Sequence, residues 1–464
     1  MESENKRHIV LIALVGAVAL IARFVGTMGE LWLDEVWALT AARSLKSPFA
    51  LYSNVALDGH QSLYTLLMYW GASFDAPFIQ RLPALLASLL SLPVFLSFTK
   101  ETNFSARIVA LLFFSLSYPV VLYSTEARGY SLMLFFGLLS MQAVFLFRTK
   151  FSWGSVCLFW STTIIAFLSN YTFLQIYLAE FLWSAYYFRR NLKKLILMHI
   201  VPALFLGGFY CVVLQALPKG SGPLAFTVDS IINIVSVGFN GPVMSAANMQ
   251  SGIVAFSIAV FVLVCCAFEL WFMAKARNER VLFYFCGLFV APLIIFCVAN
   301  PRIVLERYFL MQILLCHLLC ASFLSRLWVR TVLGKVLAML CVIAFTAGGI
   351  NHLTCHYFHG RGTTEEALRY IASHSPPAGV INISSDQHFR TVIMIDRYSL
   401  LNSSRFKYQR EPEQATWYLT QTQDSYAIPD EQKIIGDHSF RFMQSFDFTA
   451  FSGWRWDVYQ RHND

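Results

Sequence analysis

Charged residues are scarce in this chain of 464 residues. Asp, Glu, Lys and Arg make up only 13% of it, whereas 57% of the residues are hydrophobic and 42 are phenylalanine. A soluble globular enzyme, a disordered chain and a nucleic-acid-binding module all need more polar surface than this composition supplies. The sequence therefore predicts a polytopic membrane protein without a nucleic-acid partner.

Several familiar motifs are missing as well. The sequence contains no P-loop, no GxGxxG between a strand and a helix, no GxSxG and no HExxH. Cysteine is nearly absent from the C-terminal part, because nine of the ten cysteines precede residue 350 and only Cys355 follows it. An internal disulfide in the C-terminal part is therefore excluded.

Eleven apolar stretches are long enough to cross a bilayer, which takes roughly 17 to 25 residues. They are residues 9–26, 78–98, 106–123, 129–148, 153–169, 171–188, 195–214, 252–273, 281–299, 305–325 and 332–350. We expect about eleven transmembrane helices in a domain formed by residues 1–350.

The basic residues of the short loops predict the orientation, because Lys and Arg next to a span are retained on the cytoplasmic side. With the N-terminus inside, 16 of the 24 Lys and Arg residues in the first 350 residues lie at cytoplasmic span ends. We expect a multi-pass protein of the cell inner (cytoplasmic) membrane. The odd number of spans places residues 351–464 outside, in the periplasm or the extracellular space.

The C-terminal part, residues 351–464, has the pattern of a small α/β domain. The stretch 363–379 predicts a helix that Pro376 and Pro377 terminate. Strands are predicted at 380–384 (VINIS), 391–395 (TVIMI), 415–420 (ATWYLT) and 454–461 (WRWDVYQR). About 100 residues are enough for a core of their own.

The first external loop, residues 27–77, contains two amphipathic stretches. Between His60 and Phe74, apolar side chains follow helical spacing, but the stretch is too short to cross a bilayer. A second such stretch follows Glu35. We expect both to form helices that lie at the membrane interface.

The same loop carries two neighbouring carboxylates, Asp34 and Glu35, in the stretch LWLDEVW. Trp32 and Trp37 flank them, and tryptophan anchors a chain at the membrane interface. A carboxylate held there can act as a general base towards a hydroxyl group. The alternative is that Asp34 caps the helix that follows, and the two roles are compatible.

Charged residues at the outer ends of other spans also indicate a substrate-binding site. The stretch YSTEARGY contains Glu126 and Arg128 between Tyr123 and Tyr130, and Arg307 precedes Tyr308 in VLERYFL. Guanidinium groups bind phosphate through a planar fork, and tyrosine rings stack on sugars. A local Glu–Arg pair that shapes the turn is the alternative for the first stretch.

One group of residues has spacing that suits zinc: His352, Cys355, His356 and His359. Because these residues directly follow a span, solvated side chains at a helix end are the preferred interpretation. No cofactor is firmly predicted, and a divalent metal ion is not favoured.

The chain resembles the GT-C glycosyltransferases of the protein O-mannosyltransferase and lipid A aminoarabinose-transferase type, above all their bacterial members. The stretches that carry the resemblance are LWLDEVWALTAARS, GHQSLYTLLMYW, RLPALLASLL, YPVVLYSTEARGYSLMLFFGLLS, NYTFLQIYLAEFL, ERYFLMQILL and WRWDVYQR, in this order. Together they cover most of the chain.

The resemblance implies an inverting hexosyl- or pentosyltransferase. It would move a sugar from a polyprenyl-phosphate-linked donor to a hydroxyl of a glycan, lipid or protein acceptor on the non-cytoplasmic face. Asp34 would be the general base, supported by Glu35 and Glu126. The donor-phosphate and substrate-binding residues would be His60, Arg128, Arg307, Tyr123, Tyr130 and Tyr308.

The alternative function is a lipid-linked-sugar flippase or transporter. Such a protein also has many spans and intramembrane charges, but it typically contains repeated halves or paired broken helices. Neither is evident in the sequence, and every predicted inner loop is too short to be the output domain of a sensor.

Overall fold

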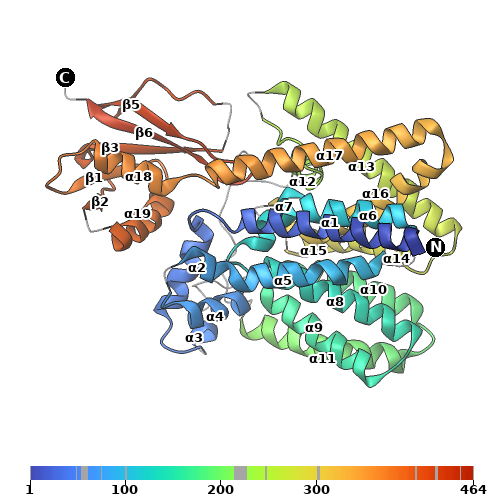
Figure 1. Ribbon diagram of the computed structural model, residues 1–464. Coiled ribbons are helices and arrows are strands. Elements are labelled where there is room, and N and C mark those ends of the chain that lie inside the picture. The colour runs from blue at the N-terminus through green and yellow to red at the C-terminus, as the bar shows by residue number, and fades with distance from the viewer. Residues whose placement is uncertain are drawn as a thin grey trace.

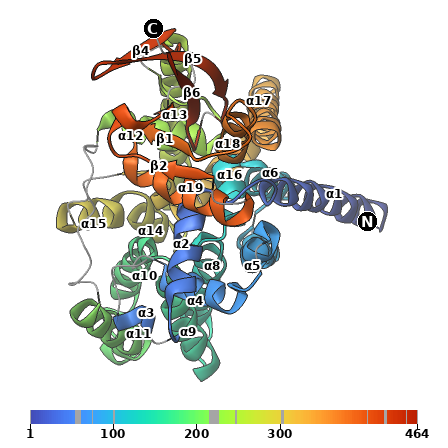
Figure 2. The same ribbon diagram turned by 90° about the vertical axis from the view of Figure 1, so that its left-hand side faces the viewer.

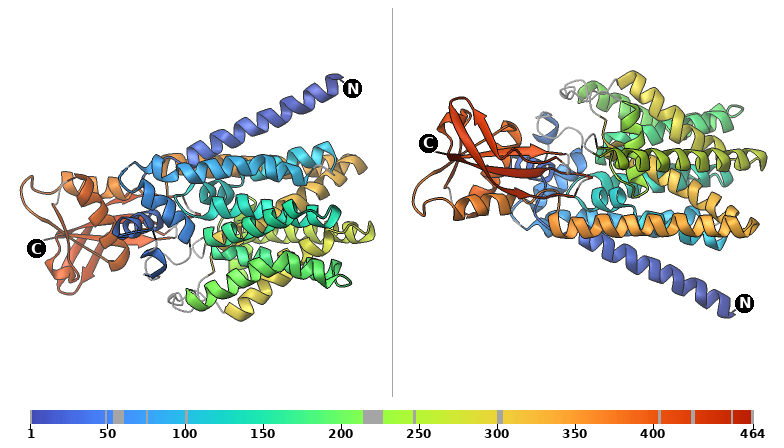
Figure 3. Two further views of the ribbon diagram at one scale, coloured as in Figure 1. Left: turned by 90° about the horizontal axis from the view of Figure 1, so that it is seen from below. Right: turned by 90° about the horizontal axis from the view of Figure 1, so that it is seen from above.

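A bundle of long helices and a smaller sheet domain make up the computed structural model (Figure 1). The structure describes residues 2–48, 50–53, 61–74, 76–99, 102–213, 227–245, 248–299, 304–402, 405–423, 427–449 and 451–462. The N-terminus lies at the end of the bundle farthest from the sheet domain, and we call the end next to the sheet domain the outer end (Figures 1 and 3).

The bundle contains a helix at every predicted span. Its members are α1 (Glu2–Gly26), α5 (Pro77–Phe98), α6 (Phe104–Leu116), α7 (Tyr118–Thr125), α8 (Tyr130–Thr149), α9 (Trp153–Ser169), the short helix η1 (Tyr171–Phe173), α10 (Leu174–Tyr187), α11 (Leu192–Val212), α13 (Met249–Lys275), α14 (Val281–Phe285), the π-helical turn η3 (Cys286–Val290), α15 (Ala291–Ala299), the short helix η4 (Glu306–Phe309), α16 (Leu310–Arg330) and α17 (Val332–His359). The fold class is thereby confirmed.

Not every helix of the bundle is long enough to cross a membrane by itself. Among the described residues, eight helices are long and apolar enough to cross a membrane, and the pair α6–α7, bent by 54°, makes a ninth if it is one span. The helix over Trp153–Ser169 is shorter, and α10 follows directly on η1. The count of eleven stays a prediction.

The bend between α6 and α7 leaves backbone groups that need partners inside the bundle. Asn240 is the partner of two of these groups. Its Oδ1 accepts from the amide of Tyr118 at 2.7 Å, and its Nδ2 donates to the carbonyl of Leu116 at 2.9 Å. The buried Arg23 of α1 donates to the carbonyls of Phe114 and Ser115. These bonds fix the direction in which α7 leads the chain to Glu126.

Short helices cover the outer end of the bundle. They are α2 (Leu33–Ser44), α3 (Ala50–Ser53), α4 (Ser62–Gly71) and α12 (Val228–Gly238). The two predicted amphipathic helices of the first loop are confirmed as α2 and α4, which pack against each other. Buried Leu39 and Tyr64 face the protein, while Trp70 is 62% exposed.

The sheet domain contains α18 (Thr364–Ser373), β1 (Ile381–Ser385), α19 (His388–Asn402), β2 (Phe406–Tyr408), the short helix η5 (Pro412–Gln414), β3 (Trp417–Thr422), β4 (Gln432–Ile435), β5 (His438–Phe446) and β6 (Arg455–His462). The strand order is β2-β1-β3-β6-β5-β4. β1 is parallel to β2 and β3, and the other neighbours are antiparallel. The helix α18 and the predicted strands β1, β3 and β6 are confirmed.

One predicted strand is wrong, because residues 391–395 (TVIMI) belong to α19. The buried side chains Thr391, Met394, Ile395 and Tyr398 recur at helical spacing. The topology also requires a helix, since parallel strands such as β1 and β2 need a crossover connection. A run of β-branched residues is therefore helical because of its place between two parallel strands.

The sheet domain packs directly on the segment between α1 and α5. Trp32 and Trp454 have ring centroids 4.1 Å apart, and Trp37 meets Phe389 of α19 at 5.1 Å. α17 continues past residue 350 to His359 and carries the chain to this domain (Figures 1 and 2). One hydrophobic core includes Leu39 of α2 and Val458 of β6. The division into domains at residue 350 stays a prediction.

Candidate active site

The charged residues of the outer end come together from four parts of the chain. α2 carries Asp34 and Glu35, the turn between α7 and α8 carries Glu126 and Arg128, η4 carries Arg307, and the link between α17 and α18 carries Arg361. All are buried or half-buried. The structure thus brings together the predicted carboxylates and the predicted arginines.

Asp34 is held by two arginines. Arg307 Nη1 lies 2.5 Å from Asp34 Oδ2, and Arg128 Nη1 lies 3.9 Å from the same oxygen. Arg128 Nη1 also donates to the backbone carbonyl of Asp34 at 3.1 Å. Although burial would raise the pKa of Asp34, the charges of Arg307, Arg128 and Arg361 hold it well below its usual range.

Glu35 has a different and fully satisfied environment. Its Oε1 accepts from Arg81 Nε at 2.8 Å and from the amide of Ala127 at 2.6 Å, and its Oε2 accepts from Arg81 Nη2 at 2.6 Å and from the amide of Trp32 at 2.8 Å. Burial would raise the pKa of Glu35, but Arg81 and these hydrogen bonds lower it. Glu35 thereby joins α2, α5 and the α7–α8 turn.

Arg81 was not among the predicted site residues. Its remaining N–H groups donate to the carbonyls of Thr27, Met28, Gly29 and Glu30, so that it shapes the chain between α1 and α2. An arginine within an apolar span is rare and is usually paired with another group. That anomaly was the signal in the sequence that points to Arg81.

Glu126 pairs with Arg361, the second residue that the sequence did not indicate. The Glu126 carboxylate is 4% exposed and forms an ion pair with the Arg361 guanidinium. That guanidinium lies 4.4 Å from the ring centroid of Trp32 and 5.7 Å from that of Tyr123. Arg361 stands between two glycines beyond the last span, and no motif marks it.

The turn that carries Arg128 is locked against two neighbouring helices. The amide of Gly129 donates to Gln61 Oε1 at 2.7 Å. A Cβ on Gly129 would lie 1.8 Å from the carbonyl oxygen of Ser169, so that only glycine fits. The sequence ARG at this turn thus sets the position of Arg128 relative to α4 and α9.

The predicted tyrosines line the same region. Tyr123 and Tyr130 have ring centroids 5.4 Å apart, and the Tyr308 ring centroid lies 5.9 Å from the Arg307 guanidinium. Gln175 Nε2 donates to the carbonyl of Tyr308 at 3.1 Å, which ties η4 to α10. The roles of these tyrosines stay predictions. His60 lies outside the described residues.

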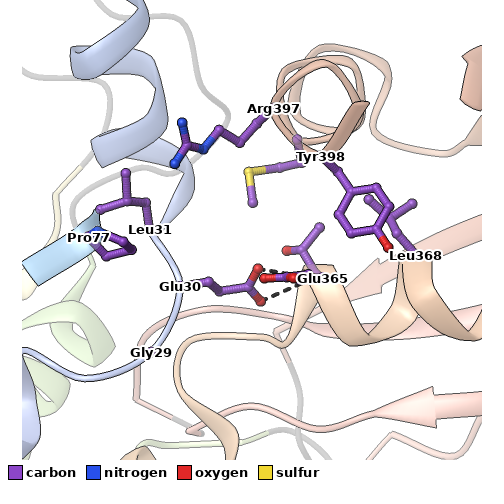
Figure 4. A pocket seen from close by; sticks show the side chains of 10 residues that line it. Gly29, Glu30, Leu31, Pro77, Glu365, Leu368, Arg397 and Tyr398 are labelled. Atoms are coloured by element: carbon purple, nitrogen blue, oxygen red, sulfur yellow. Dashed lines mark hydrogen bonds between the residues drawn. The ribbon is translucent and has the colours of Figure 1, made fainter. Parts of the chain in front are cut away.

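A pocket of about 300 Å³ lies between the segment that joins α1 to α2 and the sheet domain (Figure 4). It is lined by Glu30, Pro77, Glu365, Arg397 and Tyr398, among others. The Glu30 carboxylate accepts from the amide of Glu365 at the start of α18 at 3.0 Å. Burial and the neighbouring acidic residues raise the pKa of Glu30 to about 8.

Within the described residues, no group of three or more His, Cys, Asp or Glu side chains is arranged to hold a metal ion. Two members of the zinc-like spacing have other partners. His356 Nδ1 lies 3.0 Å from Tyr118 Oη, and His352 Nε2 lies 3.3 Å from the carbonyl of Gly241. These two histidines link α17 to α7 and to the chain after α12.

No family model and no curated protein matches the sequence. Solved structures do match. ArnT from Cupriavidus metallidurans in the apo state has a TM-score of 0.52 at 12% identity, with 88% of this chain and 92% of that chain covered. ArnT is a lipid A aminoarabinose transferase of the GT-C superfamily. The protein has the GT-C fold.

Two structures of an oligosaccharyltransferase from Archaeoglobus fulgidus share this fold. The complex with Zn and sulfate has a TM-score of 0.52 at 10% identity and covers 89% of this chain and 68% of that chain. The second structure is that of the oligosaccharyltransferase AglB in complex with an inhibitory peptide and a dolichol-phosphate. It has a TM-score of 0.51 at 9% identity and covers 90% of this chain and 70% of that chain. The GT-C fold and the apolar helices make this chain a multi-pass membrane protein.

Proposed function

We propose that the protein is a glycosyltransferase that moves a sugar from a polyprenyl-phosphate-linked donor to a hydroxyl acceptor. The observation that carries this proposal is the contact of Asp34 with both Arg128 and Arg307 at the outer end of a GT-C fold. A base for a hydroxyl group and two cations for a phosphate stand side by side. The dolichol-phosphate bound to AglB, which shares the fold, supports the class of donor.

The reaction is a displacement at the anomeric carbon. The acceptor oxygen forms a bond to that carbon while its proton passes to an Asp34 carboxylate oxygen. The bond between the anomeric carbon and the phosphate oxygen breaks, and its electron pair leaves with the polyprenyl phosphate. Because attack and departure occur on opposite faces of the sugar, the configuration inverts.

Arg128 and Arg307 act on the leaving phosphate. Negative charge develops on its oxygen as the bond breaks, and a preorganised cation stabilises that charge more in the transition state than in the ground state. Both guanidiniums are held before any donor arrives, Arg128 by the Asp34 carbonyl and Arg307 by the Asp34 carboxylate. Little reorganisation is therefore needed during the reaction.

The low pKa of Asp34 fits this scheme once the donor is bound. With the arginines facing only Asp34, their charges hold its pKa well below the usual range, which makes it a weak base. A phosphate that pairs with Arg128 and Arg307 neutralises part of their charge and raises the pKa of Asp34. Donor binding thus strengthens the base that the next step requires.

The location of the site agrees with a lipid-anchored donor. The cluster lies where the bundle ends and the short helices α2 and α4 begin, the depth at which a lipid phosphate lies when its tail is in the bilayer. We infer an inner-membrane protein with a cytoplasmic N-terminus, the site and the sheet domain being on the other face. The acceptor is a hydroxyl group of a glycan, lipid or protein, and the transferred sugar is a hexose or a pentose.

Two measurements on the purified protein test the proposal. Mass spectrometry of the lipid that copurifies should detect a polyprenyl phosphate or its sugar-linked form. Transfer from a synthetic polyprenyl-phosphate sugar is then followed for wild type, Asp34→Asn and Asp396→Asn, an exposed aspartate of α19 that serves as control. We expect donor binding by all three and transfer by wild type and the control only.

Recovery of bulk phospholipids alone, with no transfer from any polyprenyl-linked sugar, would contradict the enzymatic proposal. Transfer by Asp34→Asn at the wild-type rate would remove the base assignment and leave the activity in place. Movement of the lipid-linked sugar between leaflets of a vesicle, without a change in the donor, would favour the flippase.

A further inference from the structure

Arg361 comes from the link between the bundle and the sheet domain. Gly360 and Gly362 on either side have φ of +55° and +115°, a left-handed backbone that turns the chain sharply. A Cβ on Gly362 would lie 2.4 Å from the carbonyl oxygen of Trp454. The amide of Trp454 donates to the carbonyl of Arg361 at 3.3 Å. The sheet domain thus fixes the backbone of Arg361.

The side chain of Arg361 points away from the link and into the charged cluster. Its guanidinium pairs with Glu126, lies over the ring of Trp32 and donates to Ser452 Oγ at 2.7 Å. Only 8% of the residue is exposed. One side chain therefore touches the first loop, the α7–α8 turn and the sheet domain at once.

Glu126 depends on this pair. A buried carboxylate is costly unless a partner neutralises it, and within the described residues Arg361 is the only ion-pair partner of Glu126. Glu126 stands two residues before Arg128, in the same turn. Without Arg361, its charge would be free to attract Arg128 or Arg307, which the donor phosphate requires.

Several charged and titratable groups face Asp34 from the elements that pack around it. They are Arg307 of η4, Arg128 of the α7–α8 turn, Tyr130 at the start of α8, and Arg361 of the link. Arg361 is the member that comes with the sheet domain. Its charge adds to those of the two arginines that contact Asp34.

Resting on the proposed function, we propose that Arg361 is a positioning residue through which the sheet domain completes the catalytic centre. It forms an ion pair with Glu126, so that this carboxylate does not compete with the donor phosphate for Arg128 and Arg307. It also adds a third positive charge near Asp34. The other contacts between the domain and the loop, such as Trp32 with Trp454, only dock the two parts.

The experiment compares Arg361→Gln, Arg361→Lys and Arg455→Gln in the full chain, with a synthetic polyprenyl-phosphate sugar as donor. Arg455 is a matched control, because it is also buried and paired with a carboxylate, Asp457, within the sheet domain. We expect Arg361→Gln to raise the KM for the donor at least tenfold. We also expect its acid limb of activity to move to higher pH, since the loss of a cation raises the pKa of Asp34.

Two more variants separate charge from structure. Arg361→Lys keeps the charge and should recover at least part of both effects. Glu126→Gln leaves Arg361 unopposed, so its acid limb should move to lower pH, and this result does not require Arg361→Gln to fold. In the double variant Glu126→Gln/Arg361→Gln, the increase in KM should be smaller than in Arg361→Gln, because no free carboxylate competes for the arginines.

The possible failures are distinguishable. If wild type transfers sugar and Arg361→Gln has the same KM and pH profile, the role of Arg361 is wrong while the proposed function stands. Equal losses for Arg361→Gln and Arg455→Gln, without recovery in Arg361→Lys, would make Arg361 a purely structural residue. If wild type transfers no sugar from a polyprenyl-linked donor, the proposed function itself fails.

Discussion

The neighbouring residues Asp34 and Glu35 have carboxylates in opposite surroundings. In the Glu35 region, both carboxylate oxygens have two donors each, and the side chain is fully buried. In the Asp34 region, one oxygen contacts two arginines and the side chain is 19% exposed. Of these two consecutive residues of one helix, Glu35 is therefore a fully paired structural tie, whereas Asp34 keeps access to solvent.

The difference shows that a charged residue can bind a ligand only if some of its hydrogen-bonding positions are still unused. Glu35 has no acceptor position left for a ligand, and the guanidinium of Arg81 also donates to four backbone carbonyls. Asp34 and its arginines are held in place but keep access to solvent. A substrate can therefore exchange partners in the Asp34 region and not in the Glu35 region.

The largest expected effect is that of Asp34→Asn on transfer. Loss of a general base typically lowers the rate by about 10² to 10⁴-fold, and the amide cannot take the acceptor proton. Donor binding should persist, because Arg128 and Arg307 remain. Turnover and donor affinity, each measured on purified protein, check this, and an equal loss of both would assign Asp34 to binding instead.

Glu35→Gln should act on stability. Breaking a buried ion pair while Arg81 stays charged costs about 3–5 kcal/mol. Thermal unfolding followed by tryptophan fluorescence measures the effect. Asp430→Asn is the control, because the Asp430 side chain is 69% exposed and a surface pair such as Asp430–Lys433 is worth about 0–1 kcal/mol. If Glu35→Gln unfolds like wild type and only loses turnover, the contrast between the two regions disappears.

Arg307→Gln should reduce turnover more than Arg128→Gln, because Arg307 makes the shorter contact with Asp34. Removing a cation that stabilises developing charge costs about 2–4 kcal/mol in the transition state. Both variants should also move the acid limb of activity to higher pH, since each lost cation raises the pKa of Asp34. Arg441→Gln, at an exposed position of β5, should do neither.

The smallest effect is expected for Glu30→Gln, at the edge of the Glu35 region. Burial raises the pKa of Glu30 to about 8, so the folded protein binds the proton more tightly than the unfolded chain does. Wild type should therefore lose stability as the pH rises from about 5 to 8. Glu30→Gln should flatten this dependence and change stability at pH 5, close to the pKa of the unfolded chain, by about 1 kcal/mol or less. Melting temperatures of wild type and Glu30→Gln, measured between pH 5 and 8, test this prediction.

Much of the outer end was predictable from local patterns. Helical spacing identified α2 and α4, and the flanking tryptophans predicted that Asp34 lies at the membrane interface. The residues 391–395 show where such reasoning fails, because β-branched residues favour a strand only when a neighbouring strand is there to pair with. In this chain α19 has to cross from β1 to β2 instead.

The sequence by itself determined the membrane character of the chain, its helical spans, and the presence of carboxylates and arginines beside them, because composition and periodicity are local properties. Only the tertiary structure decided which carboxylate meets which arginine. Arg81 and Arg361 lie 46 and 235 residues from the carboxylates they neutralise. Such pairs arise when α5, the α7–α8 turn and the sheet domain pack together, since electrostatic partners are chosen by distance in space.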